Sequence, residues 1–169
     1  MGIHKFRKGL DLPIQGSPRQ TIEEAPVGES VAVIATDYVG LKARMEVQVG
    51  DAVKRGQLLL EDRKNPGVLF TAPAAGTVKA VNRGAKRALL SVVIELSDAE
   101  KAGKGEDEHV TFESYSGKGA DELSREDVAA LLKESGEWSA LRQRPFSTVP
   151  AVDSEPHALF INAMDTHPL

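Results

Sequence analysis

Hydrophobic positions recur at short intervals from Ser30 onward, in four runs rich in valine, leucine and isoleucine. These runs are SVAVIATDYVG, MEVQVGDAVKRGQLLLED, GVLFTAPAAGTVKAVNRG and ALLSVVIEL. Turn-forming residues punctuate them, with GD at Gly50, NPG at Asn65 and NRG at Asn82. Such residues adopt positive φ or hydrogen-bond their own backbone. The pattern therefore predicts a compact all-β module, which we place at residues 30–112.

The period of the pattern changes in the last third of the chain. The segment ADELSREDVAALLKESG predicts a helix, because three apolar residues fall on one helical face: Val128, Leu131 and Leu132. Ser124 and Asp127 stand at capping-box spacing before it, and Gly136 marks its end. A second short helix, EWSALRQR, is expected to end at Pro145.

Three further segments complete the predicted organisation, which is α+β. Residues 1–29 form an N-terminal extension that we expect to pack on the barrel. SDAEKAGKGEDEH, residues 97–109, is charged and aperiodic, so we expect an exposed and poorly ordered loop. HALFINAMDTHPL, residues 157–169, predicts a buried strand that runs into a turn. Because no helix follows this strand, we expect residues 113–169 to be the helices and first strand of an α/β domain that is cut short.

The stretch VGDAVKRGQLLLEDRKNPGVLFTAPAAGTV resembles lipoyl and biotinyl carrier domains, which are small flattened barrels. In those carriers a modified lysine occupies a hairpin tip that follows an acidic residue and precedes AP-x-x-G. Lys64 falls in that hairpin, after Glu61 and Asp62. The tip reads EDRKNPG and lacks the DKA and MKM tripeptides of the carriers. We therefore interpret the stretch as a barrel scaffold and retain a carrier or adaptor domain, modified at Lys64, as an alternative.

Composition and motifs exclude several kinds of chemistry. The chain has 169 residues, 41% hydrophobic and 27% charged, and no cysteine, which excludes disulfides, thiolate nucleophiles and cysteine-ligated iron–sulfur clusters in this chain. No apolar run approaches the roughly 18 residues of a membrane span, and MGIHKFRKGLDLP lacks the apolar core of a signal peptide, so we expect a cytosolic chain. The histidines show no ligand spacing, which predicts no metal site: His4, His109, His157 and His167.

Charge is distributed unevenly along the chain. The net charge is −4, yet residues 42–87 hold ten Lys or Arg against four acidic residues, about +6. The other residues hold 11 basic and 21 acidic side chains. A well-solvated surface accounts for this asymmetry, and so does an acidic partner or an anionic surface. Nucleic acid is not favoured, because the basic segment contains only one aromatic residue, Phe70, for base stacking.

The segment WSALRQRPFSTVP, residues 138–150, admits two interpretations. Trp138, Phe146 and the arginines at 142 and 144 suit a planar or anionic ligand, through stacking and bidentate hydrogen bonds. The same residues also suit a helix C-terminus, at which arginines favour the dipole while Trp138 and Phe146 anchor the core.

Four blocks, in order along the chain, carry a resemblance to one family. They are KGLDLPIQGSP, the long block from DYVGLKAR to SVVIEL, WSALRQRPFSTVP and FINAMDTHPL. Together they resemble the N-terminal part of the A subunits of sodium-translocating NADH:quinone reductases. The resemblance implies a bacterial respiratory complex that passes electrons from NADH, through flavins and iron–sulfur centres on other subunits, to ubiquinone while sodium is pumped. It implies a peripheral subunit on the cytoplasmic face of the inner membrane, which contributes to quinone binding and to assembly with the other subunits, and which as a fragment is inactive alone.

The resemblance also implies which residues contact the quinone head group. One implied segment spans residues 34–41 and the other residues 141–147, and the candidates within them are Tyr38, Val39, Gly40, Leu41, Leu141, Arg142, Arg144, Pro145 and Phe146. Tyr38 and Phe146 would flank the ring, and Arg142 or Arg144 would donate to a quinone carbonyl. No residue is expected to act as a catalytic group or to bind a cofactor covalently.

Related flavin-binding subunits of respiratory complexes have a glycine-rich GAGFP loop that cradles the flavin phosphate. Here the matching place reads SALRQRPF, in which Ala140, Leu141 and Arg142 replace the glycines. Their side chains obstruct close approach of the backbone, so FMN binding is not favoured. The Asn-x-Asp motif of those relatives is matched only in part by Asn162 and Asp165. A flavin-binding dehydrogenase fragment therefore stands as a further alternative.

Overall fold

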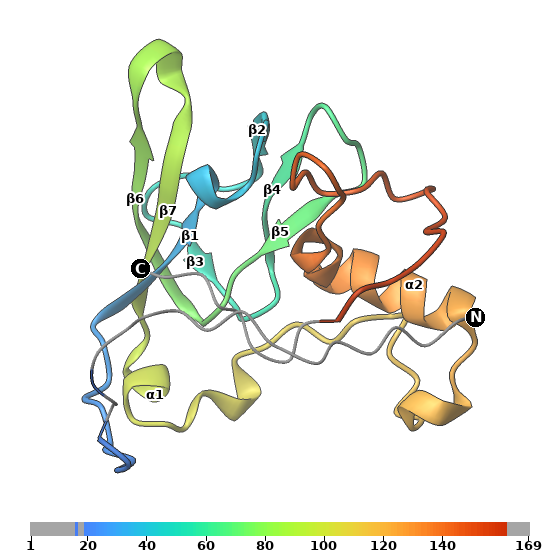
Figure 1. Cartoon of the computed structure of the whole chain (residues 1–169). Helices are drawn as coiled ribbons and strands as arrows, with labels where there is room; N and C mark the ends of the chain where they lie inside the picture. Colours follow the sequence, from blue (N-terminus) through green and yellow to red (C-terminus); the bar gives the residue numbers. More distant parts are fainter. Residues whose placement is uncertain (1–15, 17–18, 162–169) are drawn as a thin grey trace.

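The computed structural model describes residue 16 and residues 19–161, which form two antiparallel sheets curled around a shared core (Figure 1). The four-stranded sheet has the order β1-β7-β6-β3, made of β1 (Ser30–Ile34), β3 (Ala52–Val53), β6 (Gly76–Arg83) and β7 (Leu89–Leu96). The three-stranded sheet has the order β2-β4-β5, made of β2 (Ala43–Met45), β4 (Leu58–Asp62) and β5 (Leu69–Thr71). The predicted β module is confirmed.

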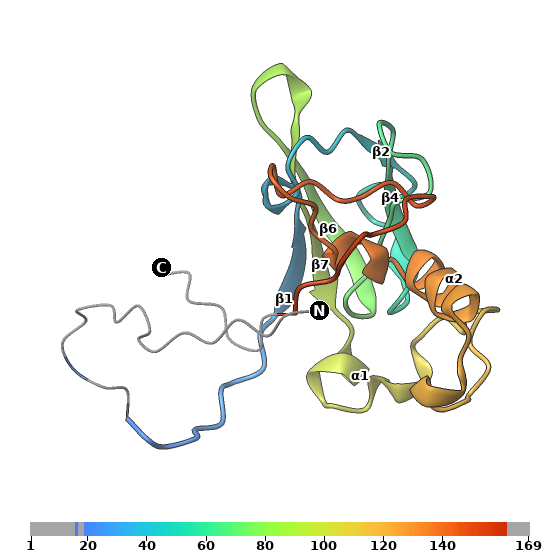
Figure 2. The same ribbon diagram turned by 45° about the vertical axis from the view of Figure 1, so that its right-hand side comes forward.

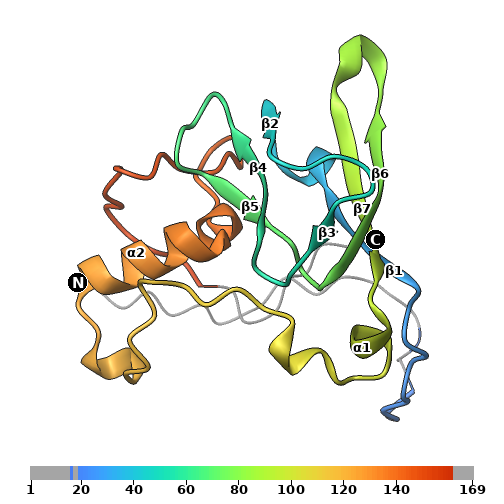
Figure 3. The same cartoon turned by 180° about the vertical axis from the view of Figure 1, so that it is seen from behind.

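Short helices accompany and follow the sheets, so the α+β class is confirmed. The α-helices are α1 (Asp98–Lys101) and α2 (Arg125–Ser135). The single turns of 3₁₀ type are η1 (Ala35–Asp37), η2 (Ala85–Arg87), η3 (Gly105–Asp107), η4 (Ala120–Glu122) and η5 (Glu137–Ala140). The view from behind shows α2 running beside β5 (Figure 3).

The core lies between the two sheets and follows from the alternation of the strands. Val92 and Ile94 on β7 point inward and are fully buried, as period-two alternation requires. On β4, the neighbouring residues Leu59 and Leu60 are both fully buried, which simple alternation does not allow. A register shift between Leu58 and Leu60 in the β4–β5 pairing resolves this, because a bulge re-aims one side chain.

Helix α2 begins and ends where the sequence predicts. The Ser124 side chain accepts from the Asp127 N–H, and the Asp127 carboxylate accepts from the Ser124 N–H, completing the capping box. Gly136 ends the helix at φ 84°. A Cβ on Gly136 would lie 3.0 Å from Oγ1 of Thr71, and that hydroxyl donates to the Ser135 carbonyl at 2.8 Å. The end of α2 is thereby held against β5.

Trp138, on η5, packs in the core of the barrel. Its side chain is 8% exposed and packs in the same cluster as the buried residues of β4 to β7. Its indole N–H donates to the Pro150 carbonyl at 3.0 Å. The interpretation of Trp138 as a core anchor is confirmed, and that of Phe146 is wrong, because Phe146 is 76% exposed.

Two predicted elements differ from the structure. The second short helix ends at Ala140, before Pro145, because Leu141 is extended (φ −70°, ψ 140°). The buried strand from His157 onward is not formed over residues 157–161, which are exposed and have no strand paired with them in the described residues. A strand needs a neighbour to satisfy its backbone groups. Residues 162–169 lie outside the described residues.

The charged segment 97–109 is ordered, contrary to prediction. Ser97 caps α1 by accepting from the Glu100 N–H, and it also donates to Glu108. The Glu100 side chain is only 9% exposed and accepts from the Ala75 N–H at 2.9 Å and from Arg55 at 2.7 Å. The Ala75 hydrogen bond lowers the pKa of Glu100 against the opposing effect of burial, and Arg55 lowers it further. A charged residue of a segment that the sequence predicts to be an exposed loop is thus paired with distant residues of the barrel, as Glu100 is with Arg55 and Ala75.

The predicted domain boundaries stay predictions. The expectation that residues 1–29 pack on the barrel falls largely on residues outside the described ones. Within that extension, residues 16 and 19–29 are exposed. Glu29 lies next to β1 and pairs with Lys101 at 3.0 Å.

We expect Trp138→Ala to lower the free energy of unfolding by about 3–5 kcal/mol, because it empties a large site in the shared core. Chemical denaturation followed by circular dichroism measures this, since Trp138 is the chain's one tryptophan and fluorescence would be lost. Phe146→Ala is the matched control and should change stability by less than about 0.5 kcal/mol. Equal effects of the two substitutions would contradict the assignment of Trp138 to the core.

We expect Glu100→Gln to destabilise the chain by about 1 kcal/mol at neutral pH. The pKa of Glu100 is lowered in the folded chain, so its carboxylate stabilises the fold above the ordinary value of 4.5, and this contribution is lost as the pH falls through the lowered folded pKa. Denaturation curves from pH 7 to 3 should therefore show the wild-type and variant stabilities converging at low pH. Glu106→Gln, at an exposed carboxylate of the same segment, is the control. A constant difference across this range would show that another effect is responsible.

Candidate functional site

The first predicted segment forms a turn between β1 and β2. Gly40 adopts φ 82°, a conformation that favours glycine, and the Leu41 N–H donates to the Tyr38 carbonyl at 3.2 Å. The turn holds the Tyr38 ring half-buried and edge-on to Phe70, with 4.6 Å between ring centroids and an interplanar angle of 81°. Phe70 is buried on β5, so it fixes the Tyr38 ring against the sheet.

The second predicted segment meets the first at Arg142. Its guanidinium carbon lies 4.9 Å from the centroid of the Tyr38 ring. The same guanidinium donates to the carbonyls of Ser139 and Leu141. Arg142 therefore links η5 to the Tyr38 turn through a cation–π contact with the Tyr38 ring. Its Nη1 group already donates to two backbone carbonyls.

The remaining residues of the second segment do not join this contact. Gln143 and Thr148 form an isolated bridge, with the Gln143 N–H donating to the Thr148 carbonyl at 2.8 Å. The residues between them are exposed: Arg144, Pro145, Phe146 and Ser147. The ring contact that Tyr38 makes is with Phe70, while Phe146 is 76% exposed, so the flanking of a quinone ring by Tyr38 and Phe146 stays a prediction.

A cavity of about 360 Å³ opens beside Tyr38. It lies where the Tyr38 turn, the β4–β5 hairpin and residues 148–151 come together. Its walls combine aromatic, aliphatic and polar side chains, from Tyr38, Val39, Gly40, Leu41, Asp62, Lys64, Asn65, Phe70, Thr148, Val149 and Ala151. All four candidates of the first segment line it, and none of the five in the second segment does.

Several lining residues were not among the quinone-site candidates. Asp62 and Asn65 belong to the carrier-like hairpin, on either side of Arg63 and Lys64. Thr148 and Val149 follow the second segment directly. A signal was present in the sequence, since the AP-x-x-G pattern identifies a hairpin tip, but nothing in it shows what lies against that tip.

The hairpin tip is held rigidly by hydrogen bonds. The Asp62 carboxylate accepts from the backbone N–H groups of Lys42 at 3.1 Å and Lys64 at 3.0 Å. The Asn65 amide donates to the carbonyls of Val149 at 3.2 Å and Pro150 at 3.1 Å. The Lys64 side chain is exposed at the cavity, and no ion pair to it is present within the described residues.

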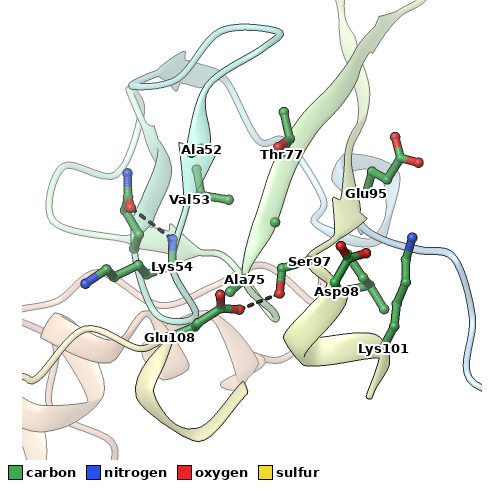
Figure 4. Close-up of a pocket in the computed structure, with 13 residues that line it drawn as sticks. Ala52, Val53, Lys54, Ala75, Thr77, Glu95, Ser97, Asp98, Lys101 and Glu108 are labelled. Atoms are coloured by element: carbon green, nitrogen blue, oxygen red, sulfur yellow. Dashed lines mark hydrogen bonds between the residues drawn. The ribbon is translucent and has the colours of Figure 1, made fainter. Parts of the chain in front are cut away.

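A second, larger cavity of about 650 Å³ lies next to α1, where β6 begins and β7 ends (Figure 4). Lys54 and Lys101 stand on its two sides, with Glu95, Asp98 and Glu108 near them (Figure 4). Side chains of both charges line this cavity. No sequence-predicted site residue lies in it, and its mixed charge selects no class of ligand.

Neither a cluster of metal ligands nor a membrane-spanning helix occurs in residue 16 and residues 19–161. There, no three His, Asp or Glu side chains gather as metal ligands would. No helix among these residues combines the length and apolarity that crossing a bilayer requires. His109 and His157 are exposed, while His4 and His167 lie outside the described residues.

Comparison with known proteins gives matches along nearly the whole chain. Residues 4–97 match the NqrA N-terminal barrel-sandwich hybrid domain, and residues 123–169 match the NqrA second alpha/beta domain. The chain is 52% identical, over 97% of its length, to the A subunits of the Na(+)-translocating NADH-quinone reductases from Actinobacillus succinogenes and Pasteurella multocida. It is 52% identical over 98% of its length to the corresponding protein of Neisseria meningitidis. The chain spans 35% of the length of each of these relatives.

Proposed function

This chain belongs to the NqrA family, and from that premise we propose that it forms the N-terminal part of the A subunit of a sodium-translocating NADH:quinone reductase and helps to bind quinone in the cavity beside Tyr38. The subunit would lie peripherally on the cytoplasmic face of the bacterial membrane, reaching the bilayer through the other subunits. Ubiquinone is the substrate of the complex in this proposal.

The observation that carries the quinone proposal is the meeting of two segments about a hundred residues apart. Arg142 lies over Tyr38, and the cavity opens directly beside that pair. The walls from Tyr38, Phe70 and Val149 offer flat aromatic and aliphatic surface to a planar ring. The volume of this cavity, about 360 Å³, falls within the range of small-molecule sites, about 300–1,000 Å³.

Lys64 is the group best placed to act on a quinone carbonyl. A quinone oxygen gains negative charge on reduction, and a nearby cation stabilises that charge. Arg142 holds backbone carbonyls through its Nη1, and Arg144 does not line the cavity. Asp62 accepts two backbone hydrogen bonds and, as a carboxylate, cannot donate. The lysine that carrier domains modify would here serve as a hydrogen-bond donor to the ligand.

We infer that FMN does not bind at residues 140–142. Leu141 packs against the core, and Arg142 lies on Tyr38. These side chains occupy the place at which a glycine loop would present its backbone N–H groups to a phosphate. Electron transfer in the proposed complex would therefore rely on flavins held by other subunits.

We expect Lys64→Met to weaken binding of a short-chain ubiquinone to the full-length subunit by about 1–3 kcal/mol, the scale of a charged hydrogen bond. Isothermal titration calorimetry measures this. Arg144→Met is the matched control, since it removes an exposed cation outside the cavity, and it should leave affinity unchanged. Unchanged affinity for Lys64→Met, or an equal loss for both variants, would remove Lys64 from the site.

The carrier alternative makes a separate prediction about the mass of the protein. The lysine of a carrier domain must be mobile, whereas the amide of Asn65, the residue after Lys64, donates hydrogen bonds to the carbonyls of Val149 and Pro150. We therefore expect the intact mass of the native protein to include no lipoyl or biotinyl group on Lys64. Detection of either group by peptide mapping would establish the carrier function instead.

A further inference from the structure

The β6–β7 hairpin extends well beyond the rest of the barrel (Figure 1, Figure 2). β1 pairs with β7 only as far as Ser91, opposite Ile34, so the hairpin continues past this point as a two-stranded ribbon. Residues 82–90, NRGAKRALL, form its outer end. We call this end the basic finger.

The basic finger carries three cations and no acidic residue: Arg83, Lys86 and Arg87. The rest of the chain holds 18 basic and 25 acidic residues. All three cations are exposed, and no ion pair to any of them is present within the described part of the chain. Positive charge is therefore concentrated at the projecting end of this hairpin, while the rest of the chain has a net negative charge.

Contacts within the finger bring like charges together. The Arg83 guanidinium donates to the Arg87 carbonyl at 3.1 Å, which holds the first arginine beside the apex. The side chain of Leu90 packs over Gly84, where an added Cβ would meet it at 3.2 Å. Leu90 thus packs against one face of the ribbon, while Arg83, Lys86 and Arg87 lie close together at its tip.

The turn at the apex violates the usual residue preference. Lys86 and Arg87 have φ values of 54° and 60°, and the Ala88 N–H donates to the Ala85 carbonyl at 3.1 Å. This geometry is that of a type I′ hairpin turn, in which Asn-Gly is strongly preferred at the two central positions. Two cations occupy these positions at a conformational cost that Asn-Gly would not incur.

The tip of the β4–β5 hairpin points to the same end of the molecule as the finger (Figure 1, Figure 3), and Arg63 directly follows β4 in this tip. Arg63 is exposed, as the finger cations are. A partner that covers the finger would therefore lie at the end of the barrel that also carries the cavity beside Tyr38.

We propose that the basic finger docks into an acidic surface of another subunit of the same complex. This proposal rests on the proposed function, because it requires that the chain assembles with other subunits. Two arginine forks suit carboxylates, which they bind through paired hydrogen bonds. The finger has no Trp or Tyr, the residues that mark membrane interfaces, so an acidic protein surface matches it better than a lipid surface does.

The test uses the full-length subunit in the assembled complex, purified through a tag on another subunit. The variant Lys86→Asn with Arg87→Gly removes two cations while giving the turn its preferred residues, so it should fold at least as stably as wild type. We expect it to dissociate from the complex at lower salt, with an affinity at least tenfold weaker. A matched control, Lys54→Ala with Lys104→Ala, removes two exposed cations elsewhere and should dissociate at the wild-type salt concentration.

Each other outcome overturns the proposal in a distinguishable way. If wild type co-purifies and the finger variant is retained equally at every salt concentration, the finger does not dock, while the proposed function stands. If wild type itself fails to co-purify at low salt, the proposed function fails, and docking fails with it. If the isolated subunit binds phosphatidylglycerol vesicles and the finger variant alone loses that binding, with retention in the complex unchanged, the partner is lipid and the assignment to a protein surface is wrong.

Discussion

Burial of Trp138 in the barrel core is the interaction on which the rest of the structure depends. The indole comes from a segment that follows the last strand by some forty residues, yet it packs among the buried residues of both sheets. Its N–H hydrogen bond to Pro150 then directs the chain back across the β4–β5 hairpin. Two contacts of the second half of the chain lie within a few residues of these two points. Arg142 lies over Tyr38, and the Val149 carbonyl accepts from the Asn65 amide.

This arrangement gives the carrier-like hairpin a different physical role. In a carrier the tip must be free, because its lysine moves between distant sites. Here Asp62 and Asn65 fix the tip from both sides, and a later part of the chain covers one flank. The hairpin therefore forms one wall of the cavity beside Tyr38, and the exposed Lys64 lines it. Rigidity favours ligand binding, because a preformed wall loses little entropy when a ring docks against it.

Local signals predicted the local structure well. The strands between Ser30 and Leu96 and the capping box at Ser124 all depend on residues near one another in sequence, and they form as expected. The segment 97–109 was mispredicted for the opposite reason, since its order comes from Arg55 and Ala75, which composition cannot reveal. The strand expected after His157 has suitable residues, but no partner strand lies beside residues 157–161 in the part of the chain described.

In the candidate site, too, the sequence identifies residues of a local segment but not the contacts between distant parts of the chain. The resemblance identified Tyr38 to Leu41, and all four residues line the cavity. It also identified residues 141–146, of which Arg142 touches Tyr38 while Phe146 is exposed. Phe70, the aromatic partner of Tyr38, is not among the residues that the resemblance identifies, because the pairing of two aromatic side chains from distant parts of the chain depends on how the barrel closes.

The late position of Trp138 also bears on how the protein is made. Synthesis proceeds at about 5–20 residues per second, so roughly 2–8 s separate the emergence of β7 from that of the indole. During that interval the sheets can pair, but the apolar site that the indole fills stays open to water. The nascent barrel is then an incomplete fold that exposes hydrophobic surface, and such species are the ones that aggregate or recruit chaperones. Completion of this core is therefore a matter of timing on the ribosome as well as of packing in the finished molecule.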